Sequence, residues 1–295
     1  MVESETDKTY KQVHQDLDSF LQFADGSTFT VGFLDKEFNY RSRDAKRYRW
    51  QVLEEYVKKG LTERKGIGKY RLVDGEAEEV DWQSADVADV INVNWPMQIE
   101  KYVKTYHKSI NIIAGAPGSG KTAFLQHFVL KNMDNPMGVT LFNNDMSPEE
   151  IKERIINAGV YVPEPAKFKV FERASDFGDV ILPDGINVID YLDLNSDLYK
   201  IGDEIEAIYR KLNRGMALIG IQKKPGQDIG LGGIFSWKRS KLYMSLDTVN
   251  DGSQKYNKLK IVKARGRTNP QLNPTGIEFK FKLIKGIKFL VTEEG

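Results

Sequence analysis

The residues best suited to chemistry form one unbroken segment in the middle of the chain. They match the pattern G-x-x-x-x-G-K-[ST] at every fixed position and read Gly115, Ala116, Pro117, Gly118, Ser119, Gly120, Lys121 and Thr122. Glycines at these places let backbone N–H groups wrap around a polyphosphate, and the lysine ammonium reaches its β- and γ-phosphates. The hydroxyl of Thr122 is suited to bind Mg²⁺. This segment therefore predicts a site for ATP, with Mg²⁺ as its metal.

An acidic residue further along the chain completes the expected metal site. Asp190 directly follows the strand expected at 186–189, the arrangement in which a carboxylate holds the shell of Mg²⁺ through water. Asp193 is an alternative, but it can instead cap the helix expected from residue 198 or simply face water. We therefore expect Asp190 and Thr122 to hold the metal.

Hydrolysis also requires a group that orients the attacking water. Asp145 comes shortly after the strand expected at 139–142, so we expect it at the same sheet edge as the phosphate-binding segment. Glu149 and Glu150 are close in sequence, but residues 147–150 read Ser-Pro-Glu-Glu, a typical capping box with Ser as N-cap and Pro at the first helical position. Asp145 is therefore the catalytic candidate here.

Alternating strands and helices must position these side chains. Strands are expected at 110–114, 139–142, 186–189, 216–221, 243–246, 259–262, 277–283 and 287–291, and helices are expected at 121–133, 148–157 and 198–213. Repeated strand–helix–strand units predict an α/β fold, with a mostly parallel sheet flanked by helices. The last strands follow one another without helices, so we expect hairpins at one edge of the sheet.

Five motifs in this order resemble the RecA-like ATPases, most closely the DnaB-type replicative helicases. They are IIAGAPGSGKTAF, LFNNDMSPEEI, NVIDYLDL, LIGIQKK and IVKARGRTNPQLNPTG, and the resemblance covers roughly residues 95–290. It implies a RecA-like fold, ATP hydrolysis, and a homo-oligomeric ring or filament. The helical domain that usually precedes the motor in such helicases is absent, so the architecture resembles a replication or recombination protein encoded by a phage or mobile element in a bacterial host.

The resemblance also implies roles for single residues. Asp145 takes the place of a catalytic glutamate, with a carboxylate one methylene shorter, and Gln222 takes that of a glutamine that senses the γ-phosphate. Lys263 and Arg265 take the places of a Lys-x-Arg pair that stabilises charge on the ATP of a neighbouring subunit. Arg267 is the second choice for this role, and the alternative is that all three form a basic strand edge kept soluble by its charge.

The first third of the chain predicts a different module. Helices expected at 8–23, 33–38 and 41–59 precede two short strands at 61–64 and 69–73, the order of a winged helix-turn-helix. Residues 36–71 hold 12 Lys/Arg against 5 Asp/Glu. Several of these basic residues lie in the first half of the helix expected at 41–59, where positive charge opposes the helix dipole. Their placement indicates that an anion outside the chain binds there. We expect duplex DNA to contact Tyr40, Arg41, Arg43, Lys46, Arg47, Arg49, Arg64, Lys65 and Lys69; the alternative is a winged helix that contacts protein.

A second expected DNA surface is the loop at 223–239, which is rich in glycine and contains several lysine and arginine residues. In RecA-like proteins a loop at this place binds single strands, so the resemblance assigns phosphate contacts to Lys224 or Lys238. Trp237 would either stack on a base or belong to the hydrophobic core.

Composition limits the remaining possibilities. The 295 residues carry a net charge of +1, no cysteine and three histidines, which excludes thiol chemistry and Cys-ligated zinc. No apolar run reaches the ~18 residues of a membrane span, and the polar N-terminus does not resemble a signal peptide, so we expect a cytoplasmic protein without membrane partners. Residues 74–89 contain seven acids and no base, which predicts a linker.

The expected organisation is therefore a winged-helix domain at 1–74, an acidic linker at 75–94 and a RecA-like ATPase domain at 95–295. The expected function is an ATP-dependent DNA-binding motor of the DnaB type. The alternative is a nucleotide-switched DNA-binding regulator, loader or partition-type ATPase that does not unwind DNA. A nucleotide kinase would share the phosphate-binding segment but has no use for a winged helix.

Overall fold

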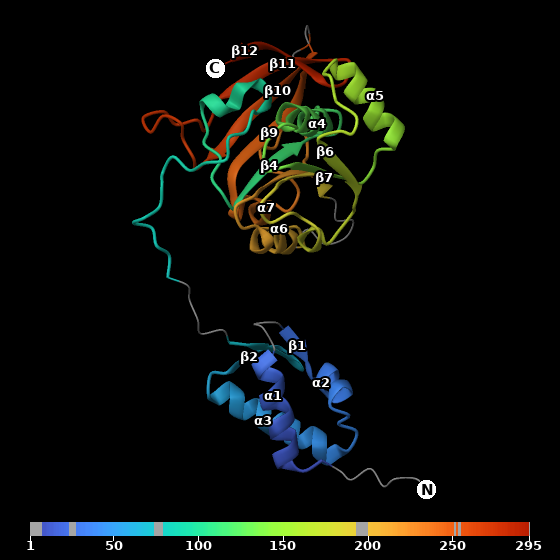
Figure 1. The fold of residues 1–295 in the computed structure, drawn as a ribbon, viewed down its shortest axis with the longest axis vertical. Coiled ribbons are helices and arrows are strands. Elements are labelled where there is room, and N and C mark those ends of the chain that lie inside the picture. Colours follow the sequence, from blue (N-terminus) through green and yellow to red (C-terminus); the bar gives the residue numbers. More distant parts are fainter. Residues whose placement is uncertain are drawn as a thin grey trace. The chain divides into compact units, whose positions relative to one another are not determined.

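The computed structural model describes residues 8–23, 28–73, 79–192, 200–250, 252 and 255–294. The chain forms two compact units, Met1–Ala85 and Asp86–Gly295 (Figure 1). The division between them falls inside the acidic segment at 75–94. Asp193 and the first residues of the helix expected from 198 lie outside the described residues.

The first unit combines three helices with a small antiparallel sheet. Its elements are α1 (Tyr10–Phe23), β1 (Thr28–Thr30), α2 (Val31–Glu37), α3 (Arg43–Lys58), β2 (Thr62–Gly66) and β3 (Lys69–Leu72). The strand order is β1-β3-β2. The expected helices and both later strands are present within two residues of their expected bounds, whereas β1 was not expected, because three residues are too short for a recognisable apolar alternation.

Local signals and a compact core explain this unit. The side chain of Ser42 accepts a hydrogen bond from the N–H of Ala45 at 3.0 Å, so α3 begins directly after a serine N-cap. Helix α1 packs against α3. The shared core contains Val13, Leu17, Phe29, Leu34, Tyr40, Val52, Leu53, Tyr56 and Tyr70.

The second unit is built on a nine-stranded sheet with the order β12-β11-β10-β9-β4-β8-β7-β5-β6. The strands are β4 (Ser109–Gly115), β5 (Val139–Asn143), β6 (Phe168–Glu172), β7 (Ile186–Leu192), β8 (Met216–Gln222), β9 (Ser240–Asn250), β10 (Lys255–Ala264), β11 (Glu278–Ile284) and β12 (Lys288–Glu294). The six strands from β9 to β6 are parallel, and β9 to β12 form an antiparallel meander at one edge. The predicted α/β class and the edge hairpins are confirmed, and β6 is an additional strand.

Helices cover both faces of this sheet. They are α4 (Lys121–Asn132), α5 (Pro148–Ala158), α6 (Lys200–Lys211) and α7 (Ile234–Lys238), together with the 3₁₀ turns η1 (Pro96–Lys101) and η2 (Phe177–Asp179). Successive strand residues point to opposite faces. Ile113 therefore packs with the α4 side of the core, and Ile112 packs with the α6 side.

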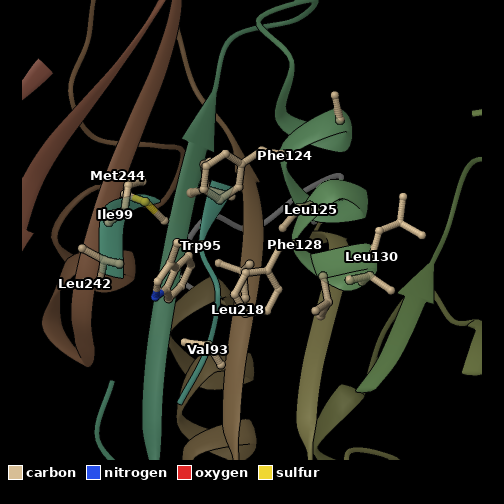
Figure 2. Packing of buried hydrophobic residues seen from close by; sticks show 14 of the residues in the cluster. Val93, Trp95, Ile99, Phe124, Leu125, Phe128, Leu130, Leu218, Leu242 and Met244 are labelled. Atoms are coloured by element: carbon tan, nitrogen blue, oxygen red, sulfur yellow. The ribbon is translucent and has the colours of Figure 1, made fainter. Parts of the chain in front are cut away.

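The core beneath α4 is centred on aromatic side chains. Trp95 is fully buried, and its ring centre lies 4.7 Å from that of Phe128 (Figure 2). The indole Nε1 of Trp95 donates a hydrogen bond to the Thr105 hydroxyl at 3.3 Å, which satisfies its buried polar atom. These contacts fix α4, and with it the phosphate-binding segment, against the sheet.

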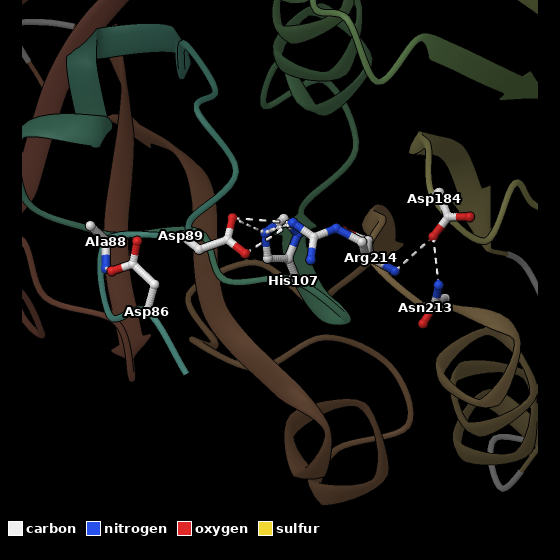
Figure 3. A network of polar contacts seen from close by, with 7 residues as sticks. All are labelled: Asp86, Ala88, Asp89, His107, Asp184, Asn213 and Arg214. Carbon is white, nitrogen blue, oxygen red and sulfur yellow. Dashed lines mark hydrogen bonds and ion pairs between the residues drawn. The ribbon is translucent and has the colours of Figure 1, made fainter. Parts of the chain in front are cut away.

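A polar network joins the start of the second unit to the loops that precede β4 and β8 (Figure 3). Arg214 Nη2 donates to Asp89 Oδ2 at 2.9 Å, and His107 Nε2 lies 2.9 Å from the other oxygen of Asp89. Asp184 Oδ1 accepts from the backbone N–H of Arg214 at 3.0 Å and from the Asn213 amide at 2.9 Å. The His107 and Arg214 hydrogen bonds lower the pKa of Asp89. Residue 89 is thereby tied to the sheet.

No helix in the described part of the chain is long and apolar enough to cross a bilayer.

Candidate nucleotide-binding site

The phosphate-binding segment forms the turn between β4 and α4. Gly118 and Gly120 have φ of 72° and 97°, in the left-handed region that favours glycine. Gly115 allows a close approach, since a Cβ there would lie 2.9 Å from both Ser119 Oγ and Lys121 Cβ. The N–H of Ala116 bonds to Leu246 O at 3.3 Å, which attaches the turn to β9.

A cavity of about 390 Å³, partly open to solvent, lies at this turn. Its lining includes the expected residues Gly115, Ala116, Pro117, Gly118, Gly120, Lys121, Thr122, Asp145 and Gln222. It also includes Ala123, Arg154, Tyr191, Leu283 and Gly286, which the sequence did not indicate. Ser119 is fully buried within the turn. The fold therefore brings four separate expected motifs to one cavity.

Asp190 lies next to the start of α4. Its side chain is fully buried, and the Thr122 hydroxyl donates to Oδ1 at 3.2 Å. The second oxygen, Oδ2, is buried without a hydrogen-bond partner among the described residues. Burial raises the pKa of Asp190 to about 6, while the nearby Lys121 ammonium acts in the opposite direction. The sequence suggested that Asp190 directly follows the strand. In the structure β7 continues to Leu192, so Asp190 lies within the strand.

These residues fit a Mg²⁺ ion. Mg²⁺ is commonly held by one or two protein oxygens together with water and substrate phosphates. A buried carboxylate oxygen without a partner, beside a threonine hydroxyl at a phosphate-binding turn, supplies donors of this type. Thr122 and Asp190 are the residues that would hold the ion.

Asp145 and Gln222 reach the same cavity from two other strands. Asp145 follows β5 in a turn closed by Asn143, whose side chain accepts from the N–H of Met146 at 3.1 Å and donates to its carbonyl at 2.7 Å. Gln222 is the last residue of β8. The capping box of Ser147 and Glu150 is present, so the expected structural role of Glu150 is confirmed.

Tyr191 and Arg154 were missed by the sequence reasoning. The Lys121 ammonium lies 3.7 Å from the centre of the Tyr191 ring, a cation–π contact. Arg154 on α5 donates to Gly286 O at 3.2 Å in the β11–β12 turn. The only signal for Tyr191 was its position beside Asp190, and nothing in the sequence linked residue 154 to the C-terminal hairpin.

Lys263 and Arg265 do not line this cavity. Lys263 Nζ donates to Trp237 O at 2.7 Å and to the Ser240 hydroxyl at 3.2 Å. Burial lowers the pKa of Lys263 to about 8, with smaller contributions from the positive charges of Arg265 and Lys241. Arg265 is exposed. Within its own chain, Lys263 thus donates a hydrogen bond to the backbone carbonyl of Trp237 near the end of α7.

The loop at 223–239 is anchored at its base. Lys223 Nζ is fully buried and lies 2.5 Å from Asp247 Oδ2. Lys224 and Lys238 are exposed. Trp237 is half-buried, and its ring centre lies 5.4 Å from that of Tyr243, so it packs against the core.

The expected basic surface of the first unit is only partly free. Arg43, Lys46, Arg47 and Lys69 are exposed, although Arg47 also contacts Asp44 at 3.1 Å. Arg41 is exposed and bonds the Asn39 side chain at 2.7 Å. Arg64 forms an ion pair with Glu54, and Lys65 forms one with Glu63.

Two of the expected DNA contacts have structural roles instead. Arg49 pairs with Asp35 and donates to Val31 O at 3.2 Å, and only 11% of its side chain is exposed. Tyr40 is buried, with its hydroxyl 3.1 Å from Asp16 Oδ2, so its prediction as a DNA contact is wrong. The Tyr40 hydroxyl lies at Asp16 on α1 and the Arg49 guanidinium lies at Asp35 on α2, so both side chains face the interior of the unit.

Comparison with known proteins agrees with the architecture. A KaiC-like protein from the hyperthermophilic archaeon Pyrococcus horikoshii is similar in structure, with a TM-score of 0.53 at 14% sequence identity, over 69% of this chain and 99% of that one. No protein-family model and no curated protein sequence matches the chain. The sheet order, its flanking helices and this likeness define a RecA-like α/β fold.

Proposed function

We propose that the chain is a Mg²⁺-dependent ATPase. One observation carries the proposal: the phosphate-binding turn, the Thr122–Asp190 pair, Asp145 and Gln222 line or adjoin a single cavity at the carboxyl edge of the parallel strands. Ligands of open α/β sheets bind at this edge. The KaiC-like structural neighbour supports the same class of fold.

In this proposal each residue has a separate task. The backbone N–H groups of the turn and the Lys121 ammonium bind the phosphates, and Asp145 orients the attacking water and accepts its proton. The Gln222 amide contacts the γ-phosphate. When bound at Thr122 and Asp190, Mg²⁺ supplies charge that offsets that of the phosphates.

We further propose that ATP hydrolysis serves a DNA-binding motor of the DnaB type that acts as a ring or filament. The motif order, the exposed Lys224 and Lys238 in the segment that follows Gln222, and the helix-rich first unit with its antiparallel sheet support this proposal. The first unit has the element order of a winged helix and would bind duplex DNA. Arg265, exposed and outside the cavity of its own chain, is suited to reach the ATP of a neighbouring subunit.

The deciding experiment measures ATP turnover without DNA, with duplex DNA and with single strands, together with the mass of the protein with and without ATP. Stimulation by single strands and an ATP-dependent increase in mass support the motor. Absence of any turnover in Mg²⁺, with Lys121→Ala indistinguishable from the parent protein, would remove the ATPase proposal itself.

Asp145 favours a second candidate, a nucleotide-switched DNA-binding regulator or loader. Its carboxylate is one methylene shorter than that of the glutamate expected in this family, so it reaches less far toward the attacking water. Slow hydrolysis suits a timer. Asp145→Glu would then accelerate turnover, and DNA binding would depend on the bound nucleotide while single strands leave the rate unchanged.

A further inference from the structure

An exposed tryptophan lies within the basic face of α3. Trp50 is 53% exposed, although its indole is a large and mostly apolar group. It follows Arg43 by seven residues, Lys46 by four and Arg47 by three, so the four side chains share one face of the helix. The opposite face of α3 is buried through Ala45, Val52, Leu53 and Tyr56.

The charge around Trp50 selects the kind of partner. Arg43 and Lys46 are exposed cations on the same helix face as Trp50. The two acids of this face are already paired, Asp44 with Arg47 and Glu54 with Arg64. A partner of this face therefore carries negative charge around an apolar patch. Duplex DNA has this combination in its major groove, where phosphates flank the methyl groups of thymine.

We propose that Trp50 is a specificity-determining residue of the first unit, whose indole contacts thymine methyl groups in the major groove while Arg43 and Lys46 bind the flanking phosphates. This inference rests on the proposed binding of duplex DNA by that unit. In this arrangement the cations supply affinity for DNA, and the apolar contact of Trp50 supplies preference for particular base pairs.

The test uses the full chain without nucleotide and measures its binding to a fluorescent A/T-rich duplex by anisotropy. The same duplex with uracil in place of thymine lacks only the methyl groups. The parent protein is expected to prefer thymine. Trp50→Ala should weaken binding to the thymine duplex about tenfold, or ~1.4 kcal/mol, and should abolish the preference. Because an apolar contact releases no counterions, the salt dependence should stay unchanged.

Matched variants separate this inference from the proposal on which it rests. Trp82→Ala removes another exposed tryptophan, 73% exposed in the acidic segment, and should leave binding unchanged. Arg43→Ala should lower the log–log salt slope by about 0.9. Thermal unfolding of Trp50→Ala, together with Trp50→Phe as a milder change, checks that the unit remains folded.

Each result has a defined meaning. If the parent protein does not bind duplex DNA, the proposed DNA binding fails and the inference falls with it. If the parent protein binds but Arg43→Ala has no effect, α3 is not the face that contacts DNA and the inference on Trp50 is overturned. If Arg43→Ala weakens binding and Trp50→Ala does not, only the inference on Trp50 is overturned. Equal affinity of the parent protein for the thymine and uracil duplexes, or a loss in Trp50→Ala confined to single strands, also overturns it.

Discussion

The Lys121 ammonium lies 3.7 Å from the centre of the Tyr191 ring, so the residue that defines the phosphate-binding turn is in contact with the residue that follows Asp190. The two residues come from α4 and β7. This contact places the lysine at the wall of the cavity, next to the carboxylate expected to hold Mg²⁺. It has consequences for variants of both residues.

Lys121→Ala should reduce ATP turnover by roughly 100-fold or more, because it removes a charge that stabilises the transferring phosphate. The fold should be unaffected, since the ammonium contacts the cavity and not the hydrophobic core. Steady-state ATPase assays and thermal unfolding check the two parts. Undiminished turnover in a folded variant would contradict the assignment of the site.

Tyr191→Leu should weaken ATP binding by about two- to fivefold, because the lysine loses a cation–π contact worth ~0.5–1 kcal/mol and becomes less well oriented. Tyr191→Phe keeps the ring and should bind ATP like the parent protein. Titration with a fluorescent ATP analogue measures both. Tighter binding by Tyr191→Leu would mean that the ring competes with phosphate for the ammonium.

Arg265→Ala should retain ATP binding and lose most of the turnover, because a residue that acts from a neighbouring subunit stabilises the transition state. Mixing it with Lys121→Ala protein should restore part of the activity, since some interfaces then combine an intact Lys121 with an intact Arg265. Turnover that is independent of protein concentration, with no recovery on mixing, would show that the site is complete within one chain.

Lys263 should make stability depend on pH. Burial lowers the pKa of Lys263 to about 8 in the folded protein, from an ordinary value of 10.5. Between these pH values the Lys263 amine is therefore more fully protonated in the unfolded chain than in the folded protein. The free energy of unfolding should therefore gain a contribution that rises with pH over this range, and Lys263→Met should lack it. Urea denaturation at several pH values measures the difference.

The matched control for that experiment is Lys260→Met. Asp228 raises the pKa of Lys260, so this variant should not reproduce the change in slope between about pH 8 and 10.5. Parallel stability curves for Lys263→Met and the parent protein would contradict the burial of the Lys263 ammonium.

Replacing both Arg43 and Arg47 with alanine should weaken duplex binding and lower its log–log salt slope by about 1.8, if each guanidinium contacts one phosphate. Lys11→Ala removes an exposed cation from α1 and serves as the control, with no expected change. Turnover of ATP without DNA should be the same in all three proteins. Unaltered duplex binding by the double variant would leave protein contacts as the role of this surface.

Much of the phosphate site could be predicted from the sequence, because the necessary residues are adjacent. The turn at 115–122 carries its glycines, Lys121 and Thr122 within eight residues, and the capping box of Ser147 and Glu150 is equally local. The place of Asp190 beside Thr122 could be expected because an acid near the last residues of a strand lies toward the carboxyl edge of a parallel sheet, although β7 continues two residues beyond it.

Contacts between distant segments were decided by the tertiary structure alone. Arg154 meets Gly286 across 132 positions, which no local pattern encodes. Charge in a sequence also does not reveal which cations are free, because Arg49 turns inward to Asp35 while Arg43 on the same helix stays exposed. A motif specifies the chemistry available along a few consecutive residues, whereas packing decides which remote side chains share a cavity and which charges are neutralised within the fold.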